Sequence, residues 1–349
     1  VDRYLVDEFS LADGLAGHSL ESAGPDAAAA TTAEGSAGGQ AIPLRILEPA
    51  LGSGVFLCET LAAIHRRWSA GVTGVASSRA DSRGAWDPDA WDQYVVQSLL
   101  PRICGVELLL SGCVAASIAL AVQLARTGFG FSQPARIPVY LGNSLAGPPP
   151  TGRLDFGGSL GDAAIADRRF CNAGPFHVIL GNPPFSGISQ TPDPWIAELL
   201  RGRTPGRDAV ASYYQVNGEP LGERKVWLQD DYVRFLRLAH WHVERAGCGI
   251  IGMITNHGYL DNPTFRGVRW QLLQTFPRVR VLDLHGNRRK GELAADRGHD
   301  ENVFAIDQGT AIGLFRRPPH AISASVQHAE LWGTRRQKLA ALDKASETP

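Results

Sequence analysis

The segment HVILGNPPFSGIS, residues 177–189, holds the residues of this chain that are best suited to chemistry. Its apolar run ends in Asn182, Pro183, Pro184 and Phe185. The prolines end the preceding strand, because they lack the backbone N–H that a sheet needs and fix φ at about −65°. The side-chain oxygen of Asn182 and the carbonyl of Pro183 are then two adjacent acceptors on a rigid backbone. Together they can accept both hydrogens of one amino group.

An amino nitrogen held by two acceptors is drawn from planar toward tetrahedral geometry, and its lone pair becomes available to attack a methyl group. Phe185 adds a flat apolar face on which a heteroaromatic ring can stack. The segment therefore predicts a site for the amino group of a planar substrate. A plain turn with a buried ring is the alternative for these four residues taken alone.

Three other predicted strands end in groups suited to a nucleotide-like ligand. EPALGSG, residues 48–54, follows the first, and its Gly52 and Gly54 permit a tight turn that a ligand can approach closely. Glu107 ends the second, where a carboxylate can accept hydrogen bonds from both hydroxyls of a ribose. Asn143, in GNSL, follows the third and can contact the edge of a base. Each has an ordinary alternative, namely a strand-to-helix turn, a solvated charge and an Asx turn. Their recurrence at successive strand ends is what indicates a ligand site.

Segments with the pattern of strands alternate along the chain with helical segments, which predicts an α/β sheet wound on both sides. In such a sheet, ligands bind beyond the carboxyl ends of the strands, where all the residues above lie. We expect strands at 42–49, 101–108, 135–145, 175–181, 248–256, 279–287 and 310–317, and helices at 53–68, 111–126 and 228–247.

The composition limits the class of protein. With 349 residues, 44% hydrophobic and 20% charged, the chain is typical of a globular protein with a sizeable core. No apolar run approaches the roughly 20 residues of a membrane span, and the acidic, mixed N-terminus is unlike a secretory signal. The five cysteines are scattered without metal-ligand spacing, so we expect buried thiols, a cytoplasmic protein and no bound metal. A net charge of −1 gives no general attraction to nucleic acid, so local features must indicate such a partner.

Longer motifs carry a resemblance to a known family. They are EPALGSGVF, GVELLLSGCVAASIAL, YLGNSL and NPPFSGIS, followed by GIIGMITNHGYLDNPTFRGVRWQLLQTFPRVRVLDLHGN and DENVFAIDQGTAIGLF. Over residues 1–317 the chain resembles the S-adenosylmethionine-dependent DNA N6-adenine methyltransferases. NPPF occurs also in glutamine and RNA methylases. The last two motifs are more specific to one subfamily than NPPF is. They are similar to the methyltransferase segment of type ISP (single-chain, type I-like) restriction-modification enzymes and related phage-defence methylases.

The resemblance implies a doubly wound, mostly parallel, seven-stranded sheet whose last strand, 310–317, is antiparallel. It implies a site-specific adenine DNA methyltransferase that moves a methyl group from S-adenosyl-L-methionine to N6 of a flipped adenine, as part of a restriction-modification or phage-defence system. The implied partners are DNA and a separate recognition, nuclease or helicase subunit, with no membrane. The implied cofactor residues are Glu48, Pro49, Ala50, Gly52, Gly54, Glu107, Asn143 and Ser144; the catalytic residues are Asn182, Pro183, Pro184 and Phe185; and Phe185 and Phe304 stack on the base.

Two other functions stay open at this point. One is a methyltransferase acting on RNA or on a protein glutamine, and the other is a shortened methyltransferase remnant that catalyses nothing. A nucleotide-binding dehydrogenase would share the glycine turn but gives no reason for NPPF. The expected organisation is an N-terminal helix and flexible linker at 1–41, a catalytic domain at 42–317 with insertions near 69–90 and 186–226, and a C-terminal tail at 318–349 that begins a missing target-recognition region.

Overall fold

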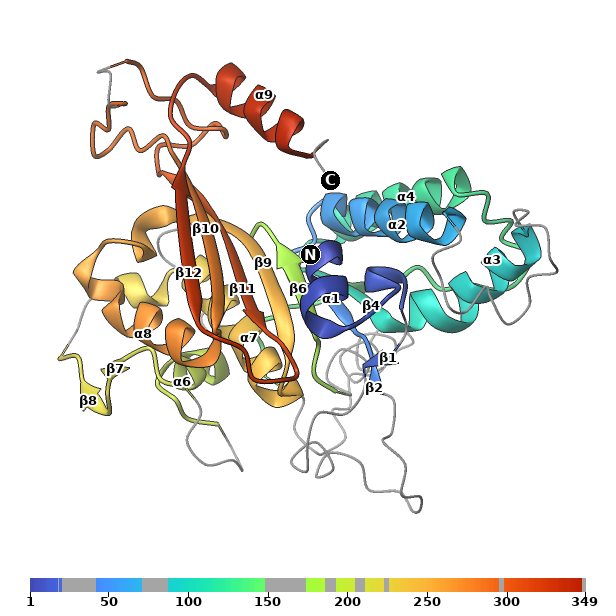
Figure 1. The fold of residues 1–349 in the computed structure, drawn as a ribbon, viewed down its shortest axis with the longest axis horizontal. Helices are drawn as coiled ribbons and strands as arrows, with labels where there is room; N and C mark the ends of the chain where they lie inside the picture. Colours follow the sequence, from blue (N-terminus) through green and yellow to red (C-terminus); the bar gives the residue numbers. More distant parts are fainter. Residues whose placement is uncertain are drawn as a thin grey trace. The chain divides into compact units, whose positions relative to one another are not determined.

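The computed structural model (Figure 1) divides the chain into two compact units. The first consists of Val1–Gly181, His242–Ile250 and Pro318–Ala321, and the second of Asn182–Trp241, Ile251–Arg317 and Ile322–Pro349. The structure describes residues 1–17, 19–20, 42–70, 87–147, 174–185, 193–204, 211–222, 226–294 and 298–346.

The first unit is built on four parallel strands. Strand β3 lies between β4 and β6, and β5 follows β4 at the edge. The start of a fifth strand belongs to this unit, where the backbone N–H of Ile250 donates to the carbonyl of His177 at 2.6 Å. The strands are β3 (Ile46–Glu48), β4 (Ile103–Glu107), β5 (Val139–Leu141), β6 (Val178–Gly181) and β9 (Gly249–Asn256).

Two long helices, α2 (Val55–Ser69) and α4 (Leu110–Arg126), pack side by side in this unit (Figure 1). The residues that α4 buries recur at intervals of three and four, the spacing that places them on one face of a helix. They are Cys113, Ala116, Leu120 and Leu124.

The N-terminal segment is fastened to the first unit by buried polar contacts. The guanidinium of Arg102 donates to the carbonyl of Leu15 at 2.6 Å and to the hydroxyl of Tyr94 at 2.8 Å. The Tyr94 hydroxyl in turn donates to the carbonyl of Ala16 at 2.7 Å. The remaining elements of this unit are α1 (Asp2–Phe9), η1 (Gly14–Ala16), β1 (Ser19–Leu20), β2 (Ile42–Pro43), α3 (Pro88–Tyr94), the π-helical turn η3 (Val95–Leu99) and η4 (Leu100–Arg102).

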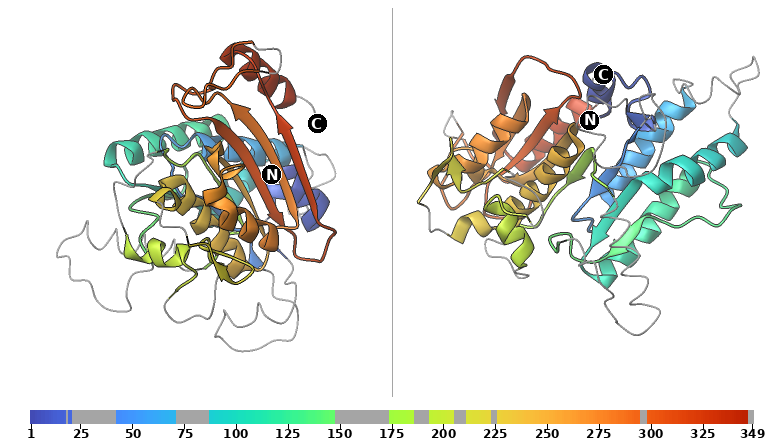
Figure 2. Two further views of the ribbon diagram at one scale, coloured as in Figure 1. Left: turned by 90° about the vertical axis from the view of Figure 1, so that its left-hand side faces the viewer. Right: turned by 90° about the horizontal axis from the view of Figure 1, so that it is seen from below.

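The second unit carries a mixed sheet, seen from two further directions in Figure 2. Strand β10 pairs with β11 in antiparallel fashion and with β12 in parallel fashion, and β11 continues to β9. These strands are β10 (Arg278–His285), β11 (Thr310–Arg317) and β12 (Ser325–Glu330). The other elements are α6 (Pro194–Leu200), β7 (Gln215–Val216), β8 (Glu219–Pro220), η5 (Val226–Gln229), α7 (Asp231–Ala246), η6 (His257–Tyr259), η7 (Pro263–Phe265), α8 (Arg266–Thr275) and α9 (Arg335–Ser346).

The predicted fold class is confirmed. All seven expected strands and all three expected helices are present, and the strand at 310–317 is antiparallel to its neighbour β10. An eighth strand, β12, was not predicted, and the sheet runs β12-β10-β11-β9-β6-β3-β4-β5. The sequence of β12 gives little signal, because most of its residues are exposed at the edge of the sheet and show no apolar alternation.

Two further expectations concern thiols and membranes. Cys58, Cys104, Cys113 and Cys248 are free thiols, and Cys171 lies outside the described residues.

Among the helices that the structure describes, none combines the length and the apolar character needed to cross a bilayer. The expected boundaries at residues 41 and 317 stay predictions. The expected insertion near 69–90 falls largely on residues outside those described, whereas the one near 186–226 is described in part and contains α6, β7 and β8.

A buried ion pair joins the C-terminal helix α9 to the second unit. Lys338 Nζ lies 2.7 Å from Asp300 Oδ1, and both side chains are fully buried. The same ammonium donates to the carbonyls of Leu284 and Glu301 at 2.6 and 2.8 Å. All three donors of Lys338 are therefore used, which compensates for burying its charge.

We expect Lys338→Met to lower the free energy of unfolding by about 3 kcal/mol, because it leaves Asp300 charged, buried and without its cation. Lys344→Met, at an exposed position of the same helix, should change it by less than about 0.5 kcal/mol. Urea unfolding of the two variants and the parent chain measures the difference. Equal stability of all three would show that α9 does not depend on this pair.

Candidate active site

The turn between β3 and α2 provides an open backbone cradle. Gly52 has φ +54°, and no atom lies within 4 Å of where a side chain would begin, so the space beside it is empty. Gly54, with φ +79°, caps α2, and a side chain there would begin 3.3 Å from Cβ of Ala116, closer than side chains ordinarily pack. Both glycines adopt conformations that other residues rarely take. The loop is tied to the sheet, since the N–H of Leu51 donates to the carbonyl of Val106 at 3.0 Å.

Glu48 is the buried acid at the start of this turn. Only 1% of the residue is exposed, and its Oε2 accepts a hydrogen bond from the N–H of Leu57 at 3.1 Å. Burial raises the pKa of the Glu48 carboxyl to about 8, against the smaller opposing effect of the Leu57 hydrogen bond. At neutral pH the carboxyl is therefore mostly protonated, and a cation beside it would favour the ionised form.

Glu107 joins the ends of β3 and β4. Its Oε2 accepts from the N–H of Gly52 and its Oε1 from the N–H of Leu109, both at 2.9 Å. The predicted ribose acceptor therefore lies directly at the glycine turn. Gly112 makes room for it, because a side chain there would overlap the Glu107 carboxylate.

Three exposed leucines follow Glu107, and sequence reasoning missed them. Leu108, Leu109 and Leu110 are 51%, 62% and 66% exposed, which is unusual for three successive large apolar residues. They give the carboxylate an apolar neighbourhood suited to a base or another planar group. The run ELLL was the available signal, but the predicted strand ended at Leu108, the predicted helix began at Ser111, and no role was assigned to the leucines.

Asn143 and Ser144 are occupied in a turn. The side-chain oxygen of Asn143 accepts from the N–H of Leu145 at 2.9 Å, an Asx turn, while Ser144 Oγ donates to the carbonyl of Pro49 at 2.6 Å. Ser144 thus fastens the end of β5 to the glycine turn. Direct contact of either side chain with a cofactor stays a prediction. Ala50, beside Pro49, is half-buried.

Asn182 follows the last residue of β6, Gly181, which lies against Pro49. The Asn182 residue is half-buried, but its Oδ1 is fully buried and forms no hydrogen bond with any residue that the structure describes. A buried amide oxygen without a donor destabilises the folded state by about 1–3 kcal/mol. A ligand that donates a hydrogen bond to this oxygen would remove that cost. Pro183 is buried, Pro184 is exposed and Phe185 is half-buried.

Phe304, expected on the opposite face of the base, is half-buried in the second unit. Its N–H donates to Asn302 Oδ1 at 2.8 Å, and its carbonyl accepts from Arg335 at 2.6 Å. The backbone is thus well held, and the stacking role of its ring stays a prediction.

Within the first unit, the structure brings the predicted cofactor residues together at one edge. Glu48, Glu107 and the turn after β5 follow three neighbouring parallel strands, and their hydrogen bonds connect them. This is the carboxyl edge of an α/β sheet, the usual place for a ligand.

No family model matches the chain, and no curated protein matches its sequence significantly. Several solved structures do match it. The ATP-dependent Type ISP restriction-modification enzyme LlaBIII bound to DNA is 20% identical, with a TM-score of 0.69 over 99% of this chain and 20% of that one. The DrdV–DNA complex is 21% identical, with a TM-score of 0.62 over 86% of this chain and 26% of that one. A nuclease-deletion mutant of the Type ISP enzyme LlaGI, in complex with a DNA substrate mimic, is 18% identical, with a TM-score of 0.63 over 86% and 23%.

The chain has a restriction-modification methyltransferase-like fold. The identities are low, so the likeness concerns the fold, and the chain spans about a fifth to a quarter of the length of these proteins. The methyltransferase-like fold agrees with the family resemblance that the motifs indicated.

Proposed function

We propose that this chain transfers a methyl group from S-adenosyl-L-methionine to N6 of adenine in DNA, as part of a restriction-modification or phage-defence system. The observation that carries the proposal is the buried Oδ1 of Asn182 directly after β6, which accepts no hydrogen bond from the part of the chain that the structure describes. An acceptor of this kind fits a substrate that brings an N–H donor. An exocyclic amino group next to a methyl donor is such a substrate.

The residues of the first unit fit the proposed cofactor in three respects. Glu48 is a buried carboxyl that an ammonium group would ionise, and Gly52 borders empty space that would admit the methionine portion. Glu107 presents a carboxylate beside exposed leucines, a combination suited to a ribose with its attached base. S-adenosyl-L-methionine supplies an activated methyl group on a positively charged sulfur.

In the proposed mechanism, the protein mainly positions the reacting groups. Asn182 Oδ1 and the Pro183 carbonyl would accept the two hydrogens of the adenine amino group and stabilise the positive charge that develops there. Phe185 would stack on the ring and align its N6 with the methyl group. The methylated nitrogen would then release its extra proton to water, so the scheme needs no side chain as general base, which agrees with a site made from an amide and a carbonyl.

DNA is the favoured substrate because of the structures that the chain resembles. LlaBIII and DrdV were solved with DNA and LlaGI with a DNA substrate mimic. To reach N6 in a duplex, the adenine must be flipped out, at a cost of a few kcal/mol. Binding at the amino group and ring would offset that cost.

Labelled-methyl transfer from S-adenosyl-L-methionine to unmethylated DNA, RNA and protein extracts tests the proposal. We expect label in DNA alone, recovered as N6-methyladenine after digestion to nucleosides. Label in RNA or in glutamine would give the chain one of the other functions. Cofactor affinity weaker than millimolar, measured by calorimetry, would indicate an inactive remnant.

Replacing Glu107 by alanine should weaken the affinity for S-adenosyl-L-methionine by about 10–100-fold. The variant loses the proposed ribose acceptor and also releases the N–H groups of Gly52 and Leu109. Glu59→Ala, at an exposed position of α2, is the control and should bind as the parent does. Calorimetric titration measures both, and equal affinities would remove Glu107 from the cofactor site.

A further inference from the structure

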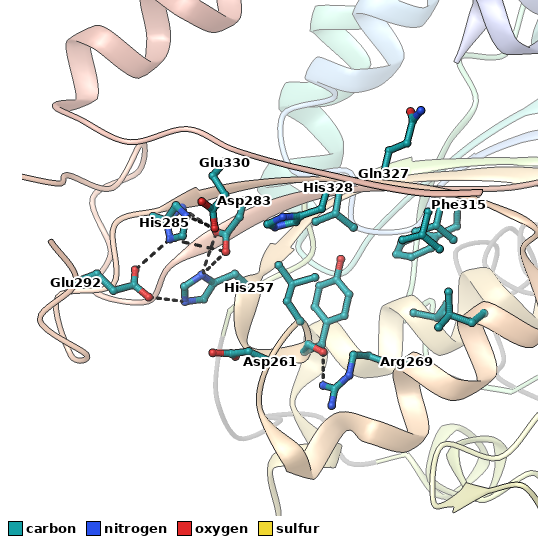
Figure 3. Close-up of a pocket in the computed structure, with 17 residues that line it drawn as sticks. His257, Asp261, Arg269, Asp283, His285, Glu292, Phe315, Gln327, His328 and Glu330 are labelled. Carbon is teal, nitrogen blue, oxygen red and sulfur yellow. Dashed lines mark hydrogen bonds and ion pairs between the residues drawn. The ribbon is translucent and has the colours of Figure 1, made fainter. Parts of the chain in front are cut away.

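A second group of chemically active side chains lies in the second unit, at the ends of β9 and β10. Figure 3 shows His257, His285 and Glu292 close together, with the Asp283 carboxylate beside Nδ1 of both rings, 3.1 Å from that of His257 and 3.8 Å from that of His285. One nitrogen or oxygen from each of the first three lies within 4.8 Å of the others. The group borders a cavity of about 440 Å³ that α8, β10 and β12 also line. The proposed methyl transfer uses none of these residues.

His257 is fixed in one orientation. Its Nδ1 lies 3.1 and 3.3 Å from the two oxygens of Asp283, and Asn287 Nδ2 donates to its Nε2 at 3.0 Å. The Asn287 amide can only donate, so Nε2 carries the lone pair and Nδ1 the proton. Gly309 packs so closely on the ring that any side chain there would overlap it. An imidazole that donates to a carboxylate through one nitrogen, with the lone pair of the other nitrogen on the opposite side, is the usual arrangement of a metal-binding histidine.

His285 is held in place without hydrogen bonds to its ring. Only 6% of the residue is exposed, and both ring nitrogens are buried and form no hydrogen bond with the described residues. The ring stacks on Trp332, with centroids 3.4 Å apart. Its backbone has φ +50° and lies at an irregularity in the pairing of β10 with β11. This left-handed backbone conformation is uncommon for residues other than glycine and asparagine, and strained backbone of this kind is concentrated at functional sites.

The carboxylates around His285 are too distant for hydrogen bonds. Its Nδ1 lies 3.7 Å from Glu292 Oε2, and its Nε2 lies 3.6 Å from Glu330 Oε1. His257 Nε2 lies 3.8 Å from Glu292 Oε1. Two ligands of one tetrahedral zinc ion, each about 2.1 Å from the metal, are about 3.4 Å apart. The two separations from Glu292 exceed that value by only a few tenths of an ångström. The three ligand atoms all lie within 4.8 Å of one another, so small movements of Glu292 and of the two rings would bring them to metal-binding distance.

We propose that His257 Nε2, His285 Nδ1 and the Glu292 carboxylate bind one zinc-like transition-metal ion. The ion replaces the contact of the Asn287 amide with His257, and Asp283 and Glu330 orient the two imidazoles from behind. Two nitrogen ligands favour Zn²⁺ or Co²⁺ over Mg²⁺ and Ca²⁺, which prefer oxygen. Since three protein ligands leave a position open toward the cavity, a small anion or water can complete the shell. Bound in this way, the ion links the ends of β9 and β10 to the loop that carries Glu292.

Metal-free full-length chain, prepared with a chelator, is titrated with ZnCl₂, CoCl₂ and MgCl₂ in a calorimeter. We expect one equivalent of Zn²⁺ or Co²⁺ to bind and Mg²⁺ not to bind. The visible absorption of the Co²⁺ form should show nitrogen and oxygen ligands in four- or five-coordinate geometry. Failure to bind Zn²⁺ at millimolar concentration would overturn the proposal.

Three variants locate the site. His285→Asn keeps a residue that tolerates the left-handed backbone, and Glu292→Gln keeps the side-chain shape; each should weaken Zn²⁺ binding by about 10²-fold or more. His328→Gln removes an exposed histidine lining the same cavity and should bind Zn²⁺ as the parent does. Binding that survives the first two substitutions, or that is lost in the third, would assign the metal to surface histidines and reject the site. Circular dichroism of each variant checks its folding, and no readout depends on methyl transfer, so this proposal and the proposed function fail independently.

Discussion

Asn182→Ala should reduce methyl transfer to DNA by about 10²–10³-fold while the affinity for S-adenosyl-L-methionine changes by less than about 3-fold. The alanine variant removes one of the two acceptors proposed to hold the adenine amino group, and with it the stabilisation of charge developing on N6. The Asn182 oxygen forms no hydrogen bond with the described cofactor residues, which are connected through β3, β4 and β5. Single-turnover methylation and calorimetry on the same preparation separate the two effects.

Asn182→Asp is the matched comparison, because it keeps a side-chain oxygen in the same position. It should retain more activity than Asn182→Ala, while both variants bind the cofactor as the parent does. The alanine variant should also be slightly more stable than the parent, since it removes a buried oxygen that forms no hydrogen bond with the described residues. Undiminished methylation by Asn182→Ala would end the assignment of NPPF as the amino-group site.

Most of the fold could be predicted because buried strands leave a strong pattern. The segment around β6, with Val178 and Ile179 fully buried, is a short apolar run closed by prolines. Strand β12 has no such pattern: it lies at the sheet edge with most side chains exposed, and only its backbone pairing with β10 defines it. Helix α9 was missed for a related reason. Its attachment depends on Lys338, a residue that sequence patterns assign to the surface.

The candidate site could be predicted residue by residue, but its connections could not. Strand ends gave Glu48, Glu107 and Asn143, because parallel strands present their carboxyl ends along one edge. The sequence did not show that Glu107 accepts from the N–H of Gly52, nor that the Asn143 oxygen is used in a turn. The first is a contact between residues that are distant in sequence, and the second depends on the conformation of a loop, so neither leaves a local pattern in the sequence.

The histidine cluster is a clearer example of contacts that local sequence patterns cannot predict. His257, His285 and Glu292 are separated by 28 and then 7 positions, which matches no local metal-binding motif. They meet because β9 and β10, which lie on either side of β11, place His257 and His285 near one another, and the loop after β10 brings in Glu292. His285 itself lies at an irregularity in the pairing of β10 with β11. The expectation of no metal rested on local spacing, and local spacing cannot detect a site assembled in this way.

Glu48→Gln should have two opposite effects: it should stabilise the cofactor-free protein at high pH and weaken binding of S-adenosyl-L-methionine by about 10–100-fold. In the folded protein, burial raises the pKa of Glu48 from its usual 4.5 to about 8. Between these pH values the folded state holds a proton that the unfolded state has released. The free energy of unfolding therefore falls as the pH rises from 4.5 through 8, and it is unaffected by this group below 4.5.

At pH 9 the buried carboxylate costs the folded protein on the order of 4 kcal/mol, whereas glutamine resembles the protonated acid and avoids that cost. Urea unfolding at pH 5 and pH 9 should thus find the two proteins alike at the lower pH and Glu48→Gln more stable at the higher.

Calorimetry in buffers of different ionisation enthalpy should show a proton released when the parent binds the cofactor below pH 8, and none for the variant. Equal stability at pH 9 together with unchanged affinity would mean that Glu48 is an ordinary core residue. The expected combination would instead mean that the empty protein carries an unfavourable buried acid, and that a cation at the turn before α2 makes its ionisation favourable.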